Sequence, residues 1–353
     1  MIELSILGSM TAALTLYFIH RFRLPAERLG LIDEPGGRKD HQQSTPLVGG
    51  LAMFVAFCFA ALLLSSSLKP FRPFFAGMGL LVITGLLDDL HDLGAREKFG
   101  LQTAAAVVMV FWGGLVIEDL GVLPLVGFVD LAWLAIPFTL VCAVGLVNAV
   151  NMMDGVDGLA GGVVLAALFW LAVIGFVSAE QAGSATALLV LLACAVAAFL
   201  FFNFPHPWRT RASVFMGDSG STMLGFALGW FAIELAFEHG SSVPPVTIAW
   251  VLGLPVFDTI ALMLRRVMKG QSPMMADREH LHHVFQRAGF SARGTVYVVA
   301  GTAFVFGAVG VIGWLAGVPE SLLWVALLVV FVLHFWFVQH AWRAMRFLRW
   351  LRH

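Results

Sequence analysis

Long apolar runs separated by short polar segments recur along the whole chain of 353 residues. Several of these runs approach the roughly 20 residues that an α-helix needs to cross a bilayer, and a few are shorter. Such runs favour helices, because a β-barrel would show short strands of alternating polarity. We predict an all-α, polytopic integral membrane protein with about eleven transmembrane helices. The predicted spans are approximately residues 3–20, 46–66, 72–87, 101–117, 131–147, 159–178, 185–202, 221–237, 246–264, 295–316 and 321–340.

The composition excludes several classes of protein. Hydrophobic residues make up 59% of the chain and charged residues 12%, against roughly 45–50% and about 25% in soluble domains. A soluble globular enzyme and a disordered chain are therefore excluded. The net charge of −1 leaves no basic surface for nucleic acid. No repeat or linker divides the chain, so we predict a single transmembrane domain over residues 1–353.

The basic residues predict the orientation. With eleven spans and the N-terminus outside, all but two of the 21 Lys and Arg residues fall in inner loops or the C-terminal tail, and Lys69 and Arg72 fall outside. This asymmetry agrees with the positive-inside rule. The first apolar run has no basic segment before it, so we expect a retained helix instead of a signal peptide. The C-terminus is then cytoplasmic.

Four polar clusters lie on the predicted inner side, at residues 85–92, 148–158, 215–221 and 277–283. Acidic residues at a membrane edge are costly and mark candidate functional sites. The second cluster gives the strongest signal, because it contains two Asn, two Asp and two Gly where a plain turn would need three or four polar residues. In the first cluster, Asp88 and Asp92 share a face if the helix continues through them, and would repel unless a cation lies there. Carboxylates suit Mg²⁺, which also takes phosphate oxygens.

The other two clusters have competing interpretations. The segment from Gly217 to Ser221 suits a phosphate at a helix start, although alone it is an ordinary N-cap. The three histidines of the fourth cluster, His280, His282 and His283, have no Cys partner and lack zincin spacing, which favours a phosphate-binding loop over zinc. Asp258 lies within a predicted span, and we expect it to join helices through hydrogen bonds.

In this order, the four clusters resemble the polyprenyl-phosphate N-acetylhexosamine-1-phosphate transferase family. The resemblance covers about residues 30 to 290 and rests on Asp-Asp-x-x-Asp, Asn-x-x-Asn-x-x-Asp-Gly-x-Asp-Gly, Gly-Asp-x-Gly-Ser and His-x-His-His. The stretches Arg38–Gln42 and Pro46–Gly50 look most like the undecaprenyl-phosphate N-acetylglucosamine-1-phosphate transferase branch. The branch acting on UDP-MurNAc-pentapeptide usually carries a His-His-His motif and a longer loop after its aspartates, and this chain has neither.

The resemblance implies a reaction in the bacterial cytoplasmic (inner) membrane. A UDP-N-acetylhexosamine, most simply UDP-GlcNAc, meets undecaprenyl phosphate at the inner face of the bilayer. The lipid phosphate attacks the β-phosphorus, which gives a lipid-diphosphate-sugar and UMP as the first membrane step of a surface polysaccharide. Because two anions must meet, the resemblance also implies Mg²⁺, with Mn²⁺ as an alternative.

Residue roles follow from the same resemblance. Asp88 and Asp89 would be catalytic by orienting or deprotonating the lipid phosphate, and Asn151 and Asp218 would ligate the metal. Asp157 would read the uracil and Asp154 would organise the nucleotide pocket, while Lys98 would meet phosphate. The remaining implied substrate-binding residues are Asn148, His280, His282 and His283, the histidines against the diphosphate or sugar.

Alternatives remain at this point. The same chemistry could act on another UDP-HexNAc, such as a 6-deoxy sugar, or on UDP-MurNAc-pentapeptide. A membrane transporter is a different class, but it should place polar residues near the midplane on broken helices. Direct attack is favoured over a covalent intermediate on Asp218, since a metal ligand is a poor nucleophile. The sequence leaves open the lipid chain length, the glycan pathway and whether the chain forms a homodimer.

Overall fold

The computed structural model describes residues 2–33, 44–178, 183–206, 209, 211–237, 241–272 and 281–340, and most of these residues are helical. Every predicted apolar run carries helix over most of its length. The α-helices are α1 (Ile2–Leu29), α2 (Gly49–Ala61), α3 (Arg72–His91), α4 (Ala95–Val107), α5 (Ala135–Met153), α6 (Leu159–Val177), α7 (Gly183–Asn203), α8 (Gly217–Phe237), α9 (Pro245–Val251), α10 (Gly253–Met268), α11 (Leu281–Arg287), α12 (Ala292–Leu315) and α13 (Glu320–Gln339).

Eight helical segments among the described residues are long and apolar enough to cross a membrane. They are α1, α3, α5 with the 3-10 turn η2 (Ala132–Leu134), α6, α7, α8, α12 and α13. The pair α9 and α10 raises the number to nine if it counts as one span. The two other predicted runs form the 13-residue α2 and α4 with its π-helical continuation η1 (Val108–Trp112). A multi-pass helical membrane protein is thus confirmed, and the count of eleven spans stays a prediction.

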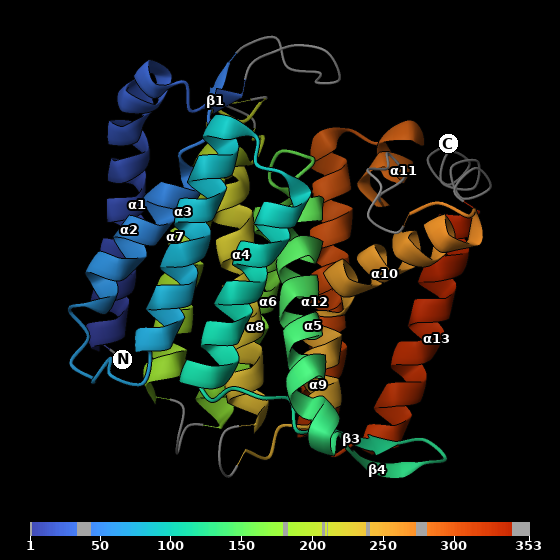
Figure 1. Cartoon of the computed structure of the whole chain (residues 1–353). Coiled ribbons are helices and arrows are strands. Elements are labelled where there is room, and N and C mark those ends of the chain that lie inside the picture. Colours follow the sequence, from blue (N-terminus) through green and yellow to red (C-terminus); the bar gives the residue numbers. More distant parts are fainter. Residues whose placement is uncertain are drawn as a thin grey trace.

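The predicted span 246–264 is not one straight helix. Helices α9 and α10 meet at Leu252 and are bent by 77°. Pro255 lies in the first turn of α10, and its nitrogen cannot donate a hydrogen bond to the carbonyl four residues earlier. Proline in the first turn of a new helix is well tolerated, whereas it would break a continuous one. In Figure 1, α10 consequently crosses between α12 and α13 instead of following the bundle axis.

Helix α8 forms the centre of the bundle. Its residues from Ser219 to Ala236 are all buried, and it packs chiefly against α3 and α5. Glycines permit this close packing: a Cβ at Gly85 of α3 would overlap the backbone nitrogen of Ser219, and one at Gly225 would lie 2.7 Å from Cα of Val147 on α5. Small residues at helix contacts let backbones approach closely in membrane proteins. The close packing fixes the ends of α3 and α5 beside the start of α8.

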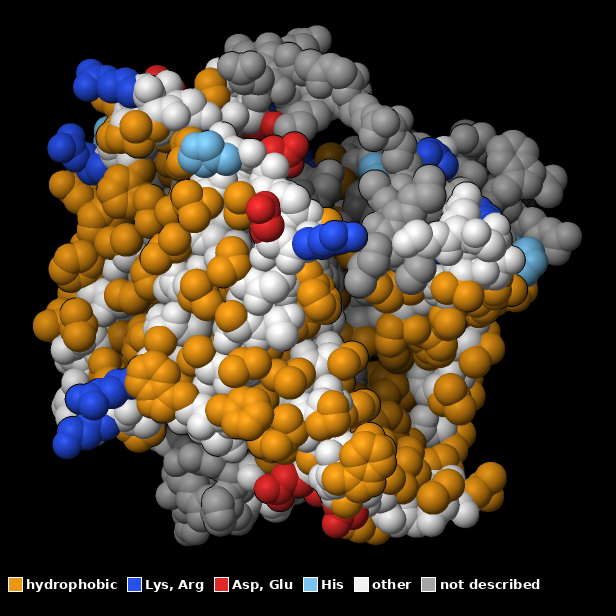
Figure 2. All heavy atoms as spheres, in the orientation of Figure 1, with side chains coloured by type: hydrophobic (Ala, Val, Ile, Leu, Met, Phe, Trp, Pro, Cys, Tyr) orange, Lys and Arg blue, Asp and Glu red, His pale blue; other side chains and the backbone are white. Residues whose placement is uncertain are grey.

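The two ends of the described helical chain lie at opposite ends of the bundle. In Figure 1, α1 begins at the lower end and α13 finishes at the upper end, as an odd number of crossings requires. Figure 2 shows a broad apolar band across this face, with charged side chains gathered toward its two ends. Such a band suits the hydrocarbon layer. Which end faces the cytoplasm stays a prediction.

Two short hairpins depart from a purely helical chain. Strands β1 (Ile32–Asp33) and β2 (Thr45–Pro46) pair antiparallel, as do β3 (Asp119–Leu123) and β4 (Gly127–Asp130). The second hairpin lies at the foot of α13 (Figure 1). There Val122 N–H donates to Glu320 Oε2 at 2.9 Å, and Trp324 Nε1 donates to Leu120 O at 3.2 Å. The all-α prediction therefore holds for the spans but not for these connections.

Candidate active site

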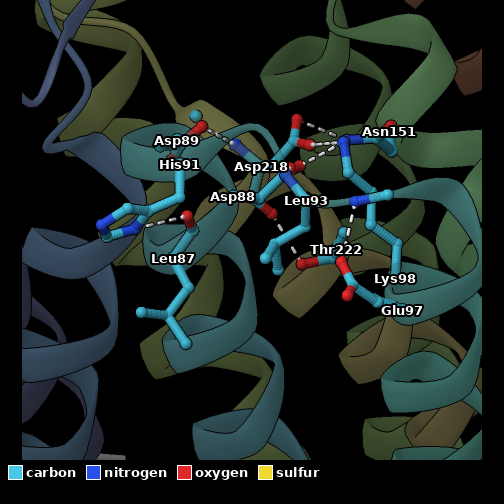
Figure 3. Close-up of polar contacts among 12 residues, drawn as sticks. Leu87, Asp88, Asp89, His91, Leu93, Glu97, Lys98, Asn151, Asp218 and Thr222 are labelled. Atoms are coloured by element: carbon cyan, nitrogen blue, oxygen red, sulfur yellow. Dashed lines mark hydrogen bonds and ion pairs between the residues drawn. The ribbon is translucent and has the colours of Figure 1, made fainter.

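Three of the four polar clusters meet at one end of the bundle. The end of α3, the end of α5 and the start of α8 lie together at its upper end in Figure 1, and Figure 3 shows their side chains. Of the fourth cluster, His280 and the side chain of His282 lie outside the described residues. His283 is half-buried in α11. Among the described residues, the centre of the site is formed by α3, α4, α5 and α8.

Asp88 is buried in the last turn of α3. Helix α3 ends at His91 because Asp92 adopts a left-handed backbone, with φ of 51°. The chain then turns so that Leu93 N–H donates to Asp88 Oδ1 at 2.8 Å. Asp88 and Asp92 consequently do not share a helical face, which would have required the helix to continue. The turn instead directs the following segment back toward Asp88.

Lys98 lies between two carboxylates. Its Nζ is 2.5 Å from Asp88 Oδ2 and 3.6 Å from Asp218 Oδ2 (Figure 3). Gly94 N–H donates to Glu97 Oε2 at 2.9 Å, a capping contact that fixes the start of α4 and the direction of Lys98. Burial alone would lower the pKa of Lys98, but hydrogen bonding to Asp88 and the charges of Asp88 and Asp218 prevail, so the pKa of Lys98 is raised. Lys98 is therefore a cation that holds two acids together.

Asp89 faces a different neighbour from Asp88. Its Oδ1 accepts a hydrogen bond from Asp218 N–H at 3.0 Å, and its buried Oδ2 has no hydrogen-bond partner among the described residues. A Cβ at Gly217, whose φ is 71°, would lie 2.5 Å from that Oδ2. Successive helix residues point about 100° apart. Asp89 therefore anchors α3 to the first turn of α8, and Asp88 faces Lys98.

Asn151 joins α5 to α8. Its Nδ2 donates to Asp218 Oδ1 and to Ser221 Oγ, each at 2.9 Å. The hydroxyl of Thr222 donates to Asp218 O at 2.6 Å, which fixes the same turn of α8. The structure thus brings together the two residues expected to ligate a metal. In this arrangement the amide nitrogen of Asn151 faces Asp218, and a rotation of the amide would present its carbonyl oxygen instead.

Asn148 has a separate environment one turn earlier on α5. Its Nδ2 donates to Gln102 Oε1 at 2.7 Å and to Val144 O at 2.8 Å. Gln102 is a buried residue of α4 that sequence analysis missed. The sequence does mark Gln102, because it is the only amide side chain in the apolar run 101–117. Asn148 therefore links α5 to α4, and neither of its two hydrogen bonds involves Asp218.

Asp154 and Asp157 occupy the turn between α5 and α6. Asp154 follows the last residue of α5, where burial and then the charges of Asp218 and Asp157 raise the pKa of Asp154 to about 7. Asp157 Oδ2 accepts from Ala212 N–H at 2.8 Å, so this turn is tied to the loop before α8.

A second missed residue supports the same turn. Asn203, buried at the end of α7, accepts from Gly158 N–H through its Oδ1 at 2.7 Å and donates to Val214 O at 3.0 Å. Gly158 has a φ of 84°, which favours glycine. Asn203 is the last residue of a hydrophobic helix and has no motif around it, so its sequence context gave no signal. The two loops at this end of the bundle are thus fixed to each other by buried hydrogen bonds.

Comparison with known proteins extends the picture. The chain matches the family described as Glycosyl transferase family 4 over residues 71–236, a range that begins one residue before α3 and ends one residue before the end of α8. It is 33% identical to the undecaprenyl-phosphate alpha-N-acetylglucosaminyl 1-phosphate transferase of Yersinia pestis, over 94% of this chain and 90% of that protein. It is 32% identical to the enzyme of the same name from Escherichia coli (strain K12), over 95% and 91%. A protein of Bacillus subtilis (strain 168) is 31% identical, over 87% and 83%.

Fold, site and relatives together define a polytopic membrane transferase. The chain belongs to glycosyl transferase family 4, among the undecaprenyl-phosphate N-acetylglucosaminyl 1-phosphate transferases. The resemblance inferred from the four sequence clusters is therefore confirmed.

Proposed function

We infer that this chain transfers GlcNAc-1-phosphate from UDP-GlcNAc to undecaprenyl phosphate and releases UMP. The observation that carries the proposal is the meeting of Asp88, Lys98, Asn151 and Asp218 at one end of the bundle. These groups supply fixed positive and negative charge where two phosphate-bearing substrates must react. The transferred sugar and the lipid acceptor are those that the names of the relatives give.

The proposed step is a direct displacement. An oxygen of the lipid phosphate forms a bond to the β-phosphorus of the donor, and the bond from that phosphorus to the bridging oxygen breaks, so UMP leaves with the electron pair. A phosphate monoester has a second pKa of about 6, so the acceptor is already largely a dianion at neutral pH. We propose that Asp88 and Lys98 orient this acceptor. Asp89 acts with them by holding α3 against the first turn of α8.

We propose that the enzyme uses Mg²⁺, with Mn²⁺ as a substitute. Asp218 and Asn151 would hold the ion, since carboxylate and amide oxygens are the hard ligands that it prefers. No group of three His, Cys, Asp or Glu residues in the described chain is arranged to hold a metal, and Mg²⁺ typically needs only one or two carboxylates plus substrate phosphates. Bound Mg²⁺ would offset the negative charge on the transferring phosphoryl group.

The other expected site residues fit a nucleotide pocket beside this centre. Asp154 and Asp157 lie on the adjacent turn, and Asp157 also shapes the loop before α8 through Ala212. We propose that these two acids bind the uridine part of the donor. His280, His282 and His283 are proposed to contact its diphosphate or sugar.

The acceptor needs an apolar surface next to the charged cluster. Figure 2 shows a hollow with apolar walls between α5 and the α10–α13 pair. Exposed apolar side chains on these helices include Val141 of α5, Ile260 of α10 and Leu328 of α13. We propose that the polyprenyl chain lies along this hollow, with its phosphate at the bundle end.

The candidate active site lies at the same end of the bundle as the C-terminal end of α1, which carries Arg21 and Arg23 (Figure 1). The positive-inside rule would place this end in the cytoplasm, where nucleotide sugars are made available. We therefore propose a multi-pass protein of the bacterial inner membrane with a cytoplasmic active site. Asp258 and Glu234 are buried acids within helices away from this cluster. Each accepts a hydrogen bond within the bundle, Asp258 from Leu281 N–H and Glu234 from Trp230 Nε1. This arrangement favours a transferase over a transporter.

A donor panel tests the proposal. Purified protein in detergent receives undecaprenyl phosphate, Mg²⁺ and separately labelled UDP-sugars, and UMP release is followed with the label in the lipid phase. We expect transfer from UDP-GlcNAc that stops with EDTA. Transfer only from another UDP-HexNAc would change the donor, and no UMP from any donor with intact protein would refute the proposed function.

A further inference from the structure

Asp258 is a buried acid on the broken span, outside the proposed active site. It lies in α10 after the 77° bend, and 2% of its surface is exposed. Its Oδ1 accepts a hydrogen bond from the backbone N–H of Leu281 at 3.2 Å. Leu281 is the first residue of α11 and stands between His280 and His282 in the sequence. A carboxylate from a membrane span thus binds the backbone inside the His-x-His-His motif.

His334 of α13 completes a contact among three elements. Its Nε2 lies 3.7 Å from Asp258 Oδ1, and its side chain is 9% exposed. Phe257 packs beside it, with ring centroids 6.4 Å apart, and Phe331 packs against Phe257 at 5.0 Å. The imidazole is therefore held in an apolar setting with the carboxylate as its close polar neighbour. α10, α11 and α13 meet at this one carboxylate.

The cost of this arrangement indicates a role beyond packing. A buried carboxylate in a membrane span is expensive unless it is paired, and such residues usually mark function. Close by, Ala261 and Leu262 of α10 pack on Val338 of α13 in a purely apolar cluster that already joins these two helices. Apolar contact therefore suffices to hold α13 on α10. What it does not supply is an acceptor for the N–H of Leu281.

We propose that Asp258, oriented by His334, is a positioning residue that fixes the start of α11 and with it the histidine motif for donor binding. This rests on the proposed function, in which the histidines contact the diphosphate or sugar of the donor. The contact acts through the backbone, so Asp258 itself need not touch substrate. Loss of the acceptor should loosen α11 and weaken binding of the UDP-sugar, while binding of undecaprenyl phosphate stays unchanged.

Four variants separate positioning from packing. Asp258→Ala removes the acceptor, and Asp258→Asn keeps a carbonyl oxygen that can still accept from Leu281 N–H. Leu262→Ala is the matched control, because it removes buried contact between α10 and α13 one helical turn away without touching Leu281. His334→Leu removes the imidazole and leaves the bond from Leu281, so it tests orientation of the carboxylate should Asp258→Ala fail to insert.

The readouts are KM for UDP-GlcNAc, KM for undecaprenyl phosphate, and hydrogen exchange of the peptide containing residues 281–287. For Asp258→Ala we expect donor KM to rise about tenfold, the equivalent of one lost hydrogen bond, with faster exchange in α11 and an unchanged lipid KM. Asp258→Asn should stay within about threefold of the wild type. His334→Leu should shift donor KM in the same direction by less.

Two results would overturn the proposal. One is wild-type exchange or wild-type donor KM in Asp258→Ala. The other is an equal rise of donor KM in Leu262→Ala at matched thermal stability. Hydrogen exchange needs no substrate, so it reports on the Asp258 contact even if the wild type lacks transferase activity, and the two failures are distinguishable.

Discussion

The side-chain amide of Asn151 lies 2.9 Å from Oδ1 of Asp218, and this contact joins the end of α5 to the first turn of α8. Two residues 67 positions apart in the sequence, each from its own polar cluster, thereby share one site. Because α8 is buried along almost its full length, neither residue can shift without repacking of the bundle core. The polar pair is thus fixed by the apolar packing beneath it.

Asn151→Ala should raise the Mg²⁺ concentration needed for half-maximal activity. The substitution removes one proposed ligand and the hydrogen bond that orients the other, and changes of this kind typically weaken metal binding about 10- to 100-fold. The measurement is a Mg²⁺ titration of UMP release at saturating substrates. Asn148→Ala is the matched control, since its amide bonds Gln102 and Val144. An equal change of the Mg²⁺ requirement in both variants would show that Asn151 is not a ligand.

Asp88→Asn should abolish most turnover while the protein still folds. The variant loses the charge that holds Lys98, so the cation no longer has a fixed position for the acceptor phosphate. We expect kcat to fall on the order of 100-fold or more, with an elution profile in detergent like that of the wild type. Full activity of this variant would remove Asp88 from the site.

Gly85→Ala should destabilise the protein through the contact of α3 with α8. The new Cβ would overlap the backbone of Ser219, which cannot move aside as a flexible side chain could. Overpacking of this kind costs about 1–3 kcal/mol of unfolding free energy, and a clear fall of Tm is expected. Gly79→Ala, on the same helix, gives an ordinary contact of 3.7 Å with Phe54 and should leave Tm nearly unchanged. A similar Tm for both variants would contradict the packing described.

Asp154→Asn should alter the pH dependence of stability. Burial and neighbouring charges raise the pKa of Asp154 from 3.8 to about 7, so the folded chain holds a proton that the unfolded chain has released. The contribution of Asp154 to the free energy of unfolding is therefore complete below pH 3.8 and is lost as the pH rises to about 7. With EDTA present, Tm of the wild type should fall relative to the variant from pH 5 to 7 and then level off. A constant difference across that range would contradict the raised pKa.

The sequence predicted the helices well, because each span must bury its backbone polar groups within an apolar run. It did not predict the 77° break between α9 and α10. Pro255 was visible, but an apolar run looks the same whether it continues straight or turns inside the protein. The β3–β4 hairpin was also missed, and two of the contacts that hold it come from Glu320 and Trp324, far along the chain.

The candidate site was predictable in composition more than in geometry. The clusters around Asp88, Asn151 and Asp218 were all identified, because acids and amides are rare beside membrane spans. The contacts of Asp88 with Leu93 and Lys98 were not predicted, since they depend on where α3 ends and on the left-handed Asp92. Gln102 was visible as the only amide in the apolar run 101–117, whereas the role of Asn203 as a partner for two loop residues appears only when distant helices pack together.

The most direct test of the account follows the β-phosphate itself. UDP-GlcNAc carrying ³²P at the β-phosphate and ¹⁴C in the sugar is incubated with undecaprenyl phosphate and the wild-type enzyme, beside Asp218→Asn. The account predicts that both labels enter the lipid in equal amounts, that the released UMP is unlabelled, and that the variant forms no labelled lipid. Transfer of ¹⁴C without ³²P, or equal labelling of lipid by Asp218→Asn, would contradict it.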